Sequence, residues 1–251
     1  MNKATQSYAA FIRACSLVGL VLIWQLVVVA IEPDLLPSPL TVLQSLWTHI
    51  ESGDLPHHLA VTLKRIAISF AIAMLLGSAL GMLMGRYKHL DLWLDSIVTL
   101  ALNIPALVTI ILCFIWFGLN EFAALTAVVL NKTPNIAITL REGTRAIDAR
   151  LLAVGRAYRV SRLHTLTRIY LPQLYPYFLA AARSGLALVW KIVLVVELLG
   201  CSSGVGFQLS LFFQFFDITS VLAYTLAFAC IIFAIEAAIL RPWERRVLQW
   251  R

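Results

Sequence analysis

Long apolar segments alternate with short polar ones along most of the chain. Six of them have the composition of membrane-spanning helices, at residues 17–31, 66–84, 104–119, 122–140, 174–196 and 221–240. A span needs about 20 apolar residues to cross about 30 Å of hydrocarbon, so the first and third segments are short. The pattern predicts an all-α integral membrane protein with six spans.

Two stretches outside these spans also have helical patterns. Residues 35–50 begin with two prolines and continue with apolar positions on one face, which predicts an amphipathic helix on the outer membrane surface. Residues 148–170 are rich in arginine and predict a pair of cytoplasmic helices. We therefore expect the first span and the outer helix in residues 1–57, the main transmembrane domain in 58–240, and a basic cytoplasmic tail in 241–251.

Composition and charge add the orientation. Hydrophobic residues make up 61% of the 251 residues and charged residues 13%, whereas soluble domains contain about 45–50% and about 25%. This excludes a soluble nucleic-acid-binding domain despite the net charge of +7. Segments 32–60, 120–121 and 197–219 contain acidic residues but no Lys or Arg, and most of the 20 basic residues lie in the alternate segments. Because basic residues mark the cytoplasmic side, we expect both termini there.

Three glycines share one spacing in the second predicted span. Gly77, Gly81 and Gly85 are four residues apart, which places them on one face of a helix. Small residues at this spacing let two membrane helices approach closely, so they predict a packing seam. Ordinary enrichment of glycine in membrane helices is the alternative.

Polar residues at membrane depth are the main candidates for a solute path. Lys132 lies near the middle of the fourth span, and Lys191 lies in the fifth. Ionisable residues are expensive in lipid and so indicate function. The candidate path consists of Asn131, Lys132, Trp190, Lys191 and Glu197. One hypothesis is a cationic lining for an anionic solute; the other is internal ion pairing, such as Lys191 with Glu197 or Glu236.

Catalytic and metal-binding patterns are absent from the sequence. It contains no glycine-rich phosphate loop, so we expect no ATP site in this chain. The five histidines and four cysteines lack the spacing of metal ligands, so we expect neither a metal nor another cofactor. An integral membrane enzyme would need a polar catalytic cluster, which these scattered residues do not provide.

The end of the cytoplasmic stretch carries a family resemblance. Its Ile169-x-Leu171-Pro172 ending resembles that of the EAA loop of ABC importer permeases. Aligned on this ending, the Glu-Ala-Ala positions of the loop fall on Ala153-Val154-Gly155, and the loop glycine falls on Arg159. This chain has neither the acidic residue nor that glycine.

Further pieces resemble the nitrate/sulfonate/taurine-type subgroup of these permeases. They occur in the expected order between residues 36 and 240: Leu36-Pro37-Ser38-Pro39, Leu76-Gly77, Trp116-Phe117-Gly118, Leu188-Val189-Trp190 and Ser203-Gly204-Val205-Gly206. The resemblance implies a six-span type I ABC importer permease with a cytoplasmic coupling helix around residues 153–164. That helix would sit in a cleft of the ATPase.

The resemblance also implies partners. It implies a homodimer of two permease copies in the lipid of a bacterial inner membrane, each copy docked on an ATPase subunit that holds ATP and Mg. A periplasmic or lipid-anchored binding protein would deliver the solute, and no nucleic acid is involved. The implied ATPase-coupling residues are Ala153, Gly155, Arg156, Tyr158, Arg159, Arg162, Leu171 and Pro172. Contact of the arginines with anionic headgroups is the alternative.

The resemblance leaves the solute open. It implies a small anion such as nitrate, a sulfonate such as taurine, or bicarbonate. A thiamine-precursor-like or other small organic solute is the alternative within the same machinery. A secondary transporter or channel is the alternative from another class, although the two halves of the chain show no internal repeat of the kind such proteins often have.

Overall fold

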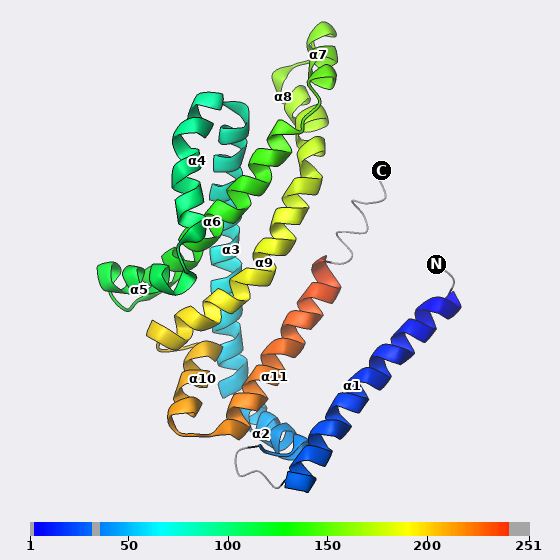
Figure 1. Ribbon diagram of the computed structural model, residues 1–251, viewed down its shortest axis with the longest axis vertical. Helices are drawn as coiled ribbons and strands as arrows, with labels where there is room; N and C mark the ends of the chain where they lie inside the picture. The colour runs from blue at the N-terminus through cyan, green and yellow to red at the C-terminus, as the bar shows by residue number, and fades with distance from the viewer. Residues whose placement is uncertain (1–2, 32–35, 241–251) are drawn as a thin grey trace.

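The structure is a computed structural model that describes residues 3–31 and 36–240, and every element in these ranges is a helix (Figure 1). The elements are α1 (Lys3–Ile31), α2 (Pro39–Glu51), α3 (Asp54–Arg86), α4 (Lys88–Asn103), α5 (Ala106–Phe117), α6 (Glu121–Arg145), α7 (Ala149–Ala157), α8 (Arg162–Thr165), η1 (Leu166–Tyr170), α9 (Leu171–Gly200), α10 (Val205–Gln214), α11 (Ile218–Ile235) and η2 (Glu236–Leu240). Here η1 and η2 are single π-helical turns. The all-α prediction is confirmed. The predicted basic tail, 241–251, lies outside the described residues.

The long helices α3, α6 and α9 cross at the centre of the molecule, and the short helix α5 lies beside them (Figure 1). At one end, α7 and α8 project beyond the body; at the other, α2 and α10 lie across it. Helix α1 stands apart from the central helices and meets the body near α2, where the Trp24 indole donates to the Pro37 carbonyl at 3.2 Å.

Helices α3 and α6 pack with almost no space between their backbones. A Cβ atom on Gly77 would lie 2.7 Å from the Ile136 Cβ, and one on Gly85 would lie 2.5 Å from the Thr144 Cβ. A Cβ on Gly81 would meet the carbonyl oxygen of Ala137. Such distances exclude any larger side chain, so all three glycines lie on the face of α3 that contacts α6.

The six predicted spans do not all appear as membrane-length helices. Within the described residues, three helices are long and apolar enough to cross a membrane: α3, the continuous helix Arg162–Gly200, and Ile218–Ala238. They cover the predicted spans 66–84, 174–196 and 221–240. The structure thus gives three such helices, or four if the bent pair α4–α5 is counted as one span.

The other predicted spans differ from the observed helices for physical reasons. Span 104–119 corresponds mainly to α5, which has 12 residues and is bent by 98° from α4. The bend falls beside Pro105, which has no N–H and disfavours helix in the residue before it. Span 122–140 lies in α6, whose apolar run is broken by polar residues 131–135. Span 17–31 lies in α1, where the apolar part is Val18–Ile31.

The predicted outer helix is confirmed as a helix, although it begins later than residue 35. Helix α2 begins at Pro39 because the Ser38 hydroxyl caps it, accepting from the Thr41 N–H at 3.2 Å. Val42 is buried, whereas Leu40 and Trp47 are exposed. Helix α2 is therefore amphipathic, with one side packed on the body and another left apolar at the surface.

Candidate functional site

The arginine-rich stretch is a pair of helices with a sharp break between them. Helix α7 ends at Ala157, and α8 begins at Arg162 after the Ser161 hydroxyl accepts from the His164 N–H at 3.3 Å. The helical pair predicted at 148–170 is confirmed. The single coupling helix expected around 153–164 is wrong, because residues 158–161 leave the helical conformation.

The break depends on one residue with a left-handed backbone. Arg159 has a φ of 51°, a conformation that costs most residues about 1–2 kcal/mol and costs glycine little. Arg159 is also where the family alignment places the loop glycine. The backbone turn that glycine favours is therefore present here, although the side chain is an arginine.

The break and its neighbours present a mixed basic and apolar surface. We call it the coupling surface: Val154, Tyr158, Arg159, Arg162 and Leu163, all exposed. Tyr158 is 80% exposed and Leu163 is 72% exposed, which is unusual for large apolar side chains in water. Such a surface is suited to contact another protein.

The remaining predicted coupling residues lie around this surface. Ala153, Leu171 and Pro172 are exposed. Gly155 is buried, and a Cβ atom on it would lie only 3.0 Å from the Ile169 side chain. Arg156 belongs to α7, but its side chain lies outside the described part of the structure. Gly155 thus packs α7 onto η1 and leaves the contact surface to its neighbours.

A largely buried ion cluster joins four segments away from the coupling surface. Arg65 of α3 donates to the Glu197 carboxylate of α9 at 2.7 Å and to the Glu121 carboxylate of α6 at 2.9 Å. It also donates to the Ser203 carbonyl at 2.6 Å. Arg65 is 4% exposed and Glu197 is 0% exposed. This cluster fastens α3, α6, α9 and the segment after α9 together.

Glu197 is also held by the segment that follows it. The Gly206 N–H donates to its carboxylate at 2.9 Å, and the Thr62 hydroxyl donates to it at 2.8 Å. A Cβ atom on Gly204, whose φ is 109°, would collide with the carboxylate. The Ser203-Gly204-Val205-Gly206 sequence therefore wraps closely around Glu197, whose oxygens are fully occupied by these partners.

The predicted solute-path residues differ from one another in burial and in pairing. Glu197 is paired with Arg65, so the suggested ion pair between Lys191 and Glu197 is wrong. Lys132 and Trp190 are buried at 4% and 6% exposure, whereas Lys191 is exposed. Neither lysine has a hydrogen bond or ion pair to the described residues. Their role as a solute path stays a prediction.

A second ion cluster, which sequence reasoning missed, lies near α7. Asp91 and Asp95 of α4 face Arg141 and Arg145 of α6, and the Arg141–Asp91 distance is 3.4 Å. The two aspartates are four residues apart on α4, and the two arginines are four residues apart on α6, so each set lies on one helix face. Two arginines at the end of α6 are thus engaged within the chain and hold α4 against α6.

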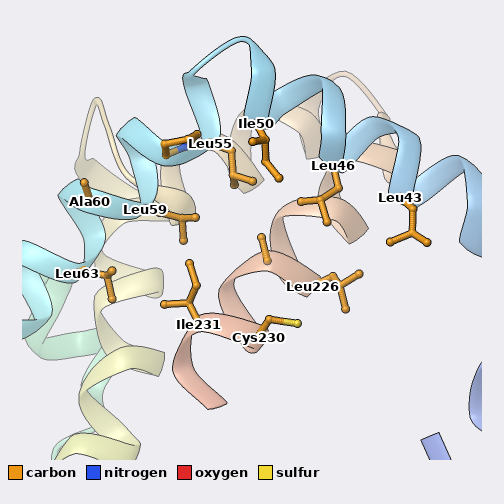
Figure 2. Close-up of a pocket in the computed structure, with 12 residues that line it drawn as sticks. Leu43, Leu46, Ile50, Leu55, Leu59, Ala60, Leu63, Leu226, Cys230 and Ile231 are labelled. Atoms are coloured by element: carbon orange, nitrogen blue, oxygen red, sulfur yellow. The ribbon is translucent and has the colours of Figure 1, made fainter. Parts of the chain in front are cut away.

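The structure also has an apolar groove of about 630 Å³ between α2, α3 and α11 (Figure 2). Leu43, Leu55, Leu226 and Ile231 are among the side chains that line it, and its walls carry almost no polar atoms. A groove of this kind offers nothing to orient a small polar solute. Within the described residues, no group of three or more His, Cys, Asp or Glu side chains is placed to hold a metal ion.

Comparison with known proteins gives consistent matches. Residues 73–241 match the family described as "binding-protein-dependent transport system inner membrane component". The chain is 30% identical over 234 residues to the putative aliphatic sulfonates transport permease protein SsuC of Bacillus subtilis, covering 92% of this chain and 84% of that protein. It is 29% identical to the taurine transport system permease protein TauC of Escherichia coli, covering 88% and 82%. It is 24% identical to the nitrate import permease protein NrtB of Synechococcus elongatus, covering 74% and 70%.

Proposed function

Because the chain belongs to the family of binding-protein-dependent transport system inner membrane components, we propose that it carries a small anion from an external binding protein into the cytoplasm. The chain is a multi-pass permease of the inner membrane and part of an ATP-driven importer. It is not itself an ATPase and holds no cofactor. Its system includes an ATPase and a binding protein.

The solute class is supported by the relatives and by charge inside the chain. The relatives are named for aliphatic sulfonates, taurine and nitrate, each of which has an anionic group. Lys132 is a buried cation with no partner among the described residues, and an anionic solute would supply one. A small sulfonate, nitrate or bicarbonate fits this charge better than a neutral or cationic solute does.

The ATPase docks on the coupling surface. The observation that carries this assignment is the left-handed Arg159 at the break between α7 and α8, where the family alignment places its loop glycine. Tyr158 and Leu163 supply the exposed apolar area that a protein contact buries, and Arg159 and Arg162 supply charge. ATP-driven movement of the ATPase then reaches the membrane through α6 and α9, which flank this surface in sequence.

Two copies of the chain form the pathway, each with six spans and both termini in the cytoplasm. Helix α6 counts as a span in this arrangement, since its polar residues are tolerated at membrane depth where they line a cavity. The outer α2 and the acidic outer segments face the binding protein. Binding protein and ATP each favour one of two states, inward-open or outward-open, and so drive alternating access.

The decisive experiment pairs charge reversal with complex isolation. The chain is expressed with the ATPase and binding protein of its own system, and Arg159→Glu is compared with Lys88→Glu, a reversal at an exposed cytoplasmic lysine away from the coupling surface. We expect Arg159→Glu to reduce ATPase co-purification and uptake at unchanged membrane insertion, and Lys88→Glu to leave both intact. Normal co-purification and uptake in Arg159→Glu would refute docking at this surface.

A further inference from the structure

Among the described residues, one buried cation has no counter-charge beside it. Among the described residues, three charged side chains are buried: Arg65, Lys132 and Glu197. Arg65 and Glu197 pair with each other at 2.7 Å. Lys132, at 4% exposure, has no hydrogen bond and no ion pair to the described residues. A buried charge without a counter-charge is strongly unfavourable, so a chain retains one where something else supplies the charge.

The helix around Lys132 is interrupted in a way that adds polar groups. Pro134 lies inside α6 and has no N–H, so the carbonyl one turn before it, at Leu130, lacks its normal helical donor. Asn131 lies beside Lys132 and is half-buried, and its side-chain amide forms no hydrogen bond to the described residues. This amide leaves donors available next to the ammonium group.

Two contacts between α6 and α9 fix how the helices are aligned. A Cβ on Gly143 would touch the Tyr177 ring at 2.5 Å, and a Cβ on Gly185 would lie 3.8 Å from Ile136. From the first contact to the second, α6 goes back seven residues while α9 advances eight, so the helices run antiparallel. Continued by one turn, this register brings Lys132 level with the segment of α9 that contains Lys191.

Lys191 therefore adds a second cation at the same depth. Lys191 is exposed on α9, next to the buried Trp190, and has no ion pair within the described part of the chain. On α6, Asn131, Asn135 and Thr139 follow at helical spacing and are half-buried or exposed. The two ammonium groups and the Asn131 amide form a setting for an anion with several acceptor oxygens.

We propose that Lys132 and Lys191 form an anion subsite at mid-membrane depth on the α6–α9 pair. The side-chain amide of Asn131 is its third hydrogen-bond donor. Its ligand is a compact monovalent oxyanion, such as a sulfonate or nitrate, whose oxygens accept from the two ammonium groups and the amide. Lys132 supplies the desolvated charge, and Lys191 guides the anion from the open face of α9. This inference rests on the proposed function and assigns the residues that select the solute.

The test uses the complete complex of permease, ATPase and binding protein in proteoliposomes. Uptake of nitrate, methanesulfonate and taurine is measured for the wild type, Lys132→Met and Lys191→Met. Lys64→Met is the matched control, because Lys64 is an exposed lysine outside the α6–α9 pair. Loss of a charge-assisted hydrogen bond predicts uptake lowered about 10- to 100-fold at low solute in both variants, with Lys64→Met unchanged.

A second measurement separates solute binding from a structural role. Without added anion, Lys132→Met should match or exceed the thermal midpoint of the wild-type complex, because it removes an unbalanced buried charge. Arg65→Met, which removes a paired buried cation, should lower the midpoint. Saturating methanesulfonate should raise the midpoint of the wild type and not of Lys132→Met. A lower midpoint for anion-free Lys132→Met would assign Lys132 to packing and overturn the subsite.

The outcomes also separate this inference from the proposed function. If Lys132→Met and Lys191→Met take up an anion as fast as the wild type does, the subsite is overturned and the proposed function stands. A wild-type complex that imports a solute without a sulfonate or nitrate group and none of the three tested solutes would overturn the proposed solute class, and the subsite with it. Uptake lost in both lysine variants and kept in Lys64→Met supports both.

Discussion

Arg65 and Glu197 lie 132 positions apart in the chain, and their charged groups meet at 2.7 Å in the interior of the protein. The pair joins the beginning of α3 to the end of α9. Breaking such a pair leaves one charge buried without a partner, which destabilises by about 3–5 kcal/mol, far more than loss of a surface ion pair.

Replacing Arg65 should therefore unfold the part of the bundle around this pair at a lower temperature. We expect Arg65→Met to lower the thermal midpoint of the purified protein by several degrees, measured by scanning fluorimetry in lipid nanodiscs. Adding Glu197→Gln to it should recover part of the loss, because the neutral amide no longer needs a counter-charge. Equal midpoints for Arg65→Met and wild type would show that the pair is not stabilising.

The glycine seam predicts a size limit on α3. Gly81→Val should prevent α3 from packing on α6, because even a Cβ there meets the Ala137 carbonyl, and should sharply reduce the yield of monodisperse protein. Gly19→Val is the control, since a Cβ at Gly19 has no neighbour within 4 Å. Size-exclusion profiles of the two variants make the comparison; equal profiles would contradict the seam.

The backbone at Arg159 predicts opposite effects for two uncharged substitutions. Arg159→Gly should relieve about 1 kcal/mol of strain, whereas Arg159→Val should add to it, because a β-branched residue tolerates a positive φ poorly. We expect the ATPase to co-purify better with Arg159→Gly than with Arg159→Val. If the two variants bind the ATPase equally, the left-handed turn does not matter for docking and the arginine charge is the property to pursue.

The outer segment after α9 makes a prediction about thiol labelling. Burial raises the pKa of the Cys201 thiol to about 11, so the reactive thiolate is scarce near neutral pH and becomes abundant only as the pH approaches that value. Ser202 is next to it and exposed. At pH 7.5, a membrane-impermeant maleimide should label Ser202→Cys in intact cells far faster than it labels Cys201.

The same reagent checks the orientation of the chain. Ser161→Cys at the coupling surface should react only after the cells are made permeable, if that surface is cytoplasmic. Fast labelling of Ser161→Cys in intact cells would reverse the proposed orientation. A wild-type Cys201 as reactive as Ser202→Cys would contradict the raised pKa of the Cys201 thiol.

The ion-pair ladder between α4 and α6 predicts a coupling defect. Arg141→Met should loosen α4, because Arg141 contacts both Asp91 and Asp95 and its side chain is 12% exposed. We expect ATP hydrolysis by the complex to continue while solute uptake per ATP falls. Lys88→Met, at an exposed lysine of α4, should keep the wild-type ratio; an unchanged ratio in Arg141→Met would limit the ladder to a local contact.

Local patterns predicted most of the helices, and long-range contacts account for what was missed. The apolar runs located α3, α9 and α11 because length and hydropathy are properties of a single segment. Helix α4 was missed since Asp91 and Asp95 interrupt its apolar pattern, and their partners lie about 50 residues later in the sequence. The i, i+4 spacing of both charge pairs was the available signal.

The same contrast between local patterns and long-range contacts applies to the candidate site. The alignment placed Arg159 at a position that favours glycine, and the backbone there has the expected turn. Glu197 was noted as a polar residue at membrane depth, but nothing local pointed to Arg65, because its partner is set by how α3 crosses α9. The sequence also could not separate buried Lys132 from exposed Lys191, since both lie in apolar surroundings.

The close contact of α3 and α6 has a mechanical consequence for transport. Gly77, Gly81 and Gly85 bring the two backbones into contact, so we expect the helices to slide little against each other and to move as one rigid strut. Helix α9 is held differently: the Tyr177 ring is tight against Gly143 at one end, while a Cβ at Gly185 would meet Phe70 only at an ordinary 3.5 Å. The far end of α9 is tied to α3 and α6 through Arg65 and Glu197, so we expect α9 to move together with this strut and to flex mainly in its middle part.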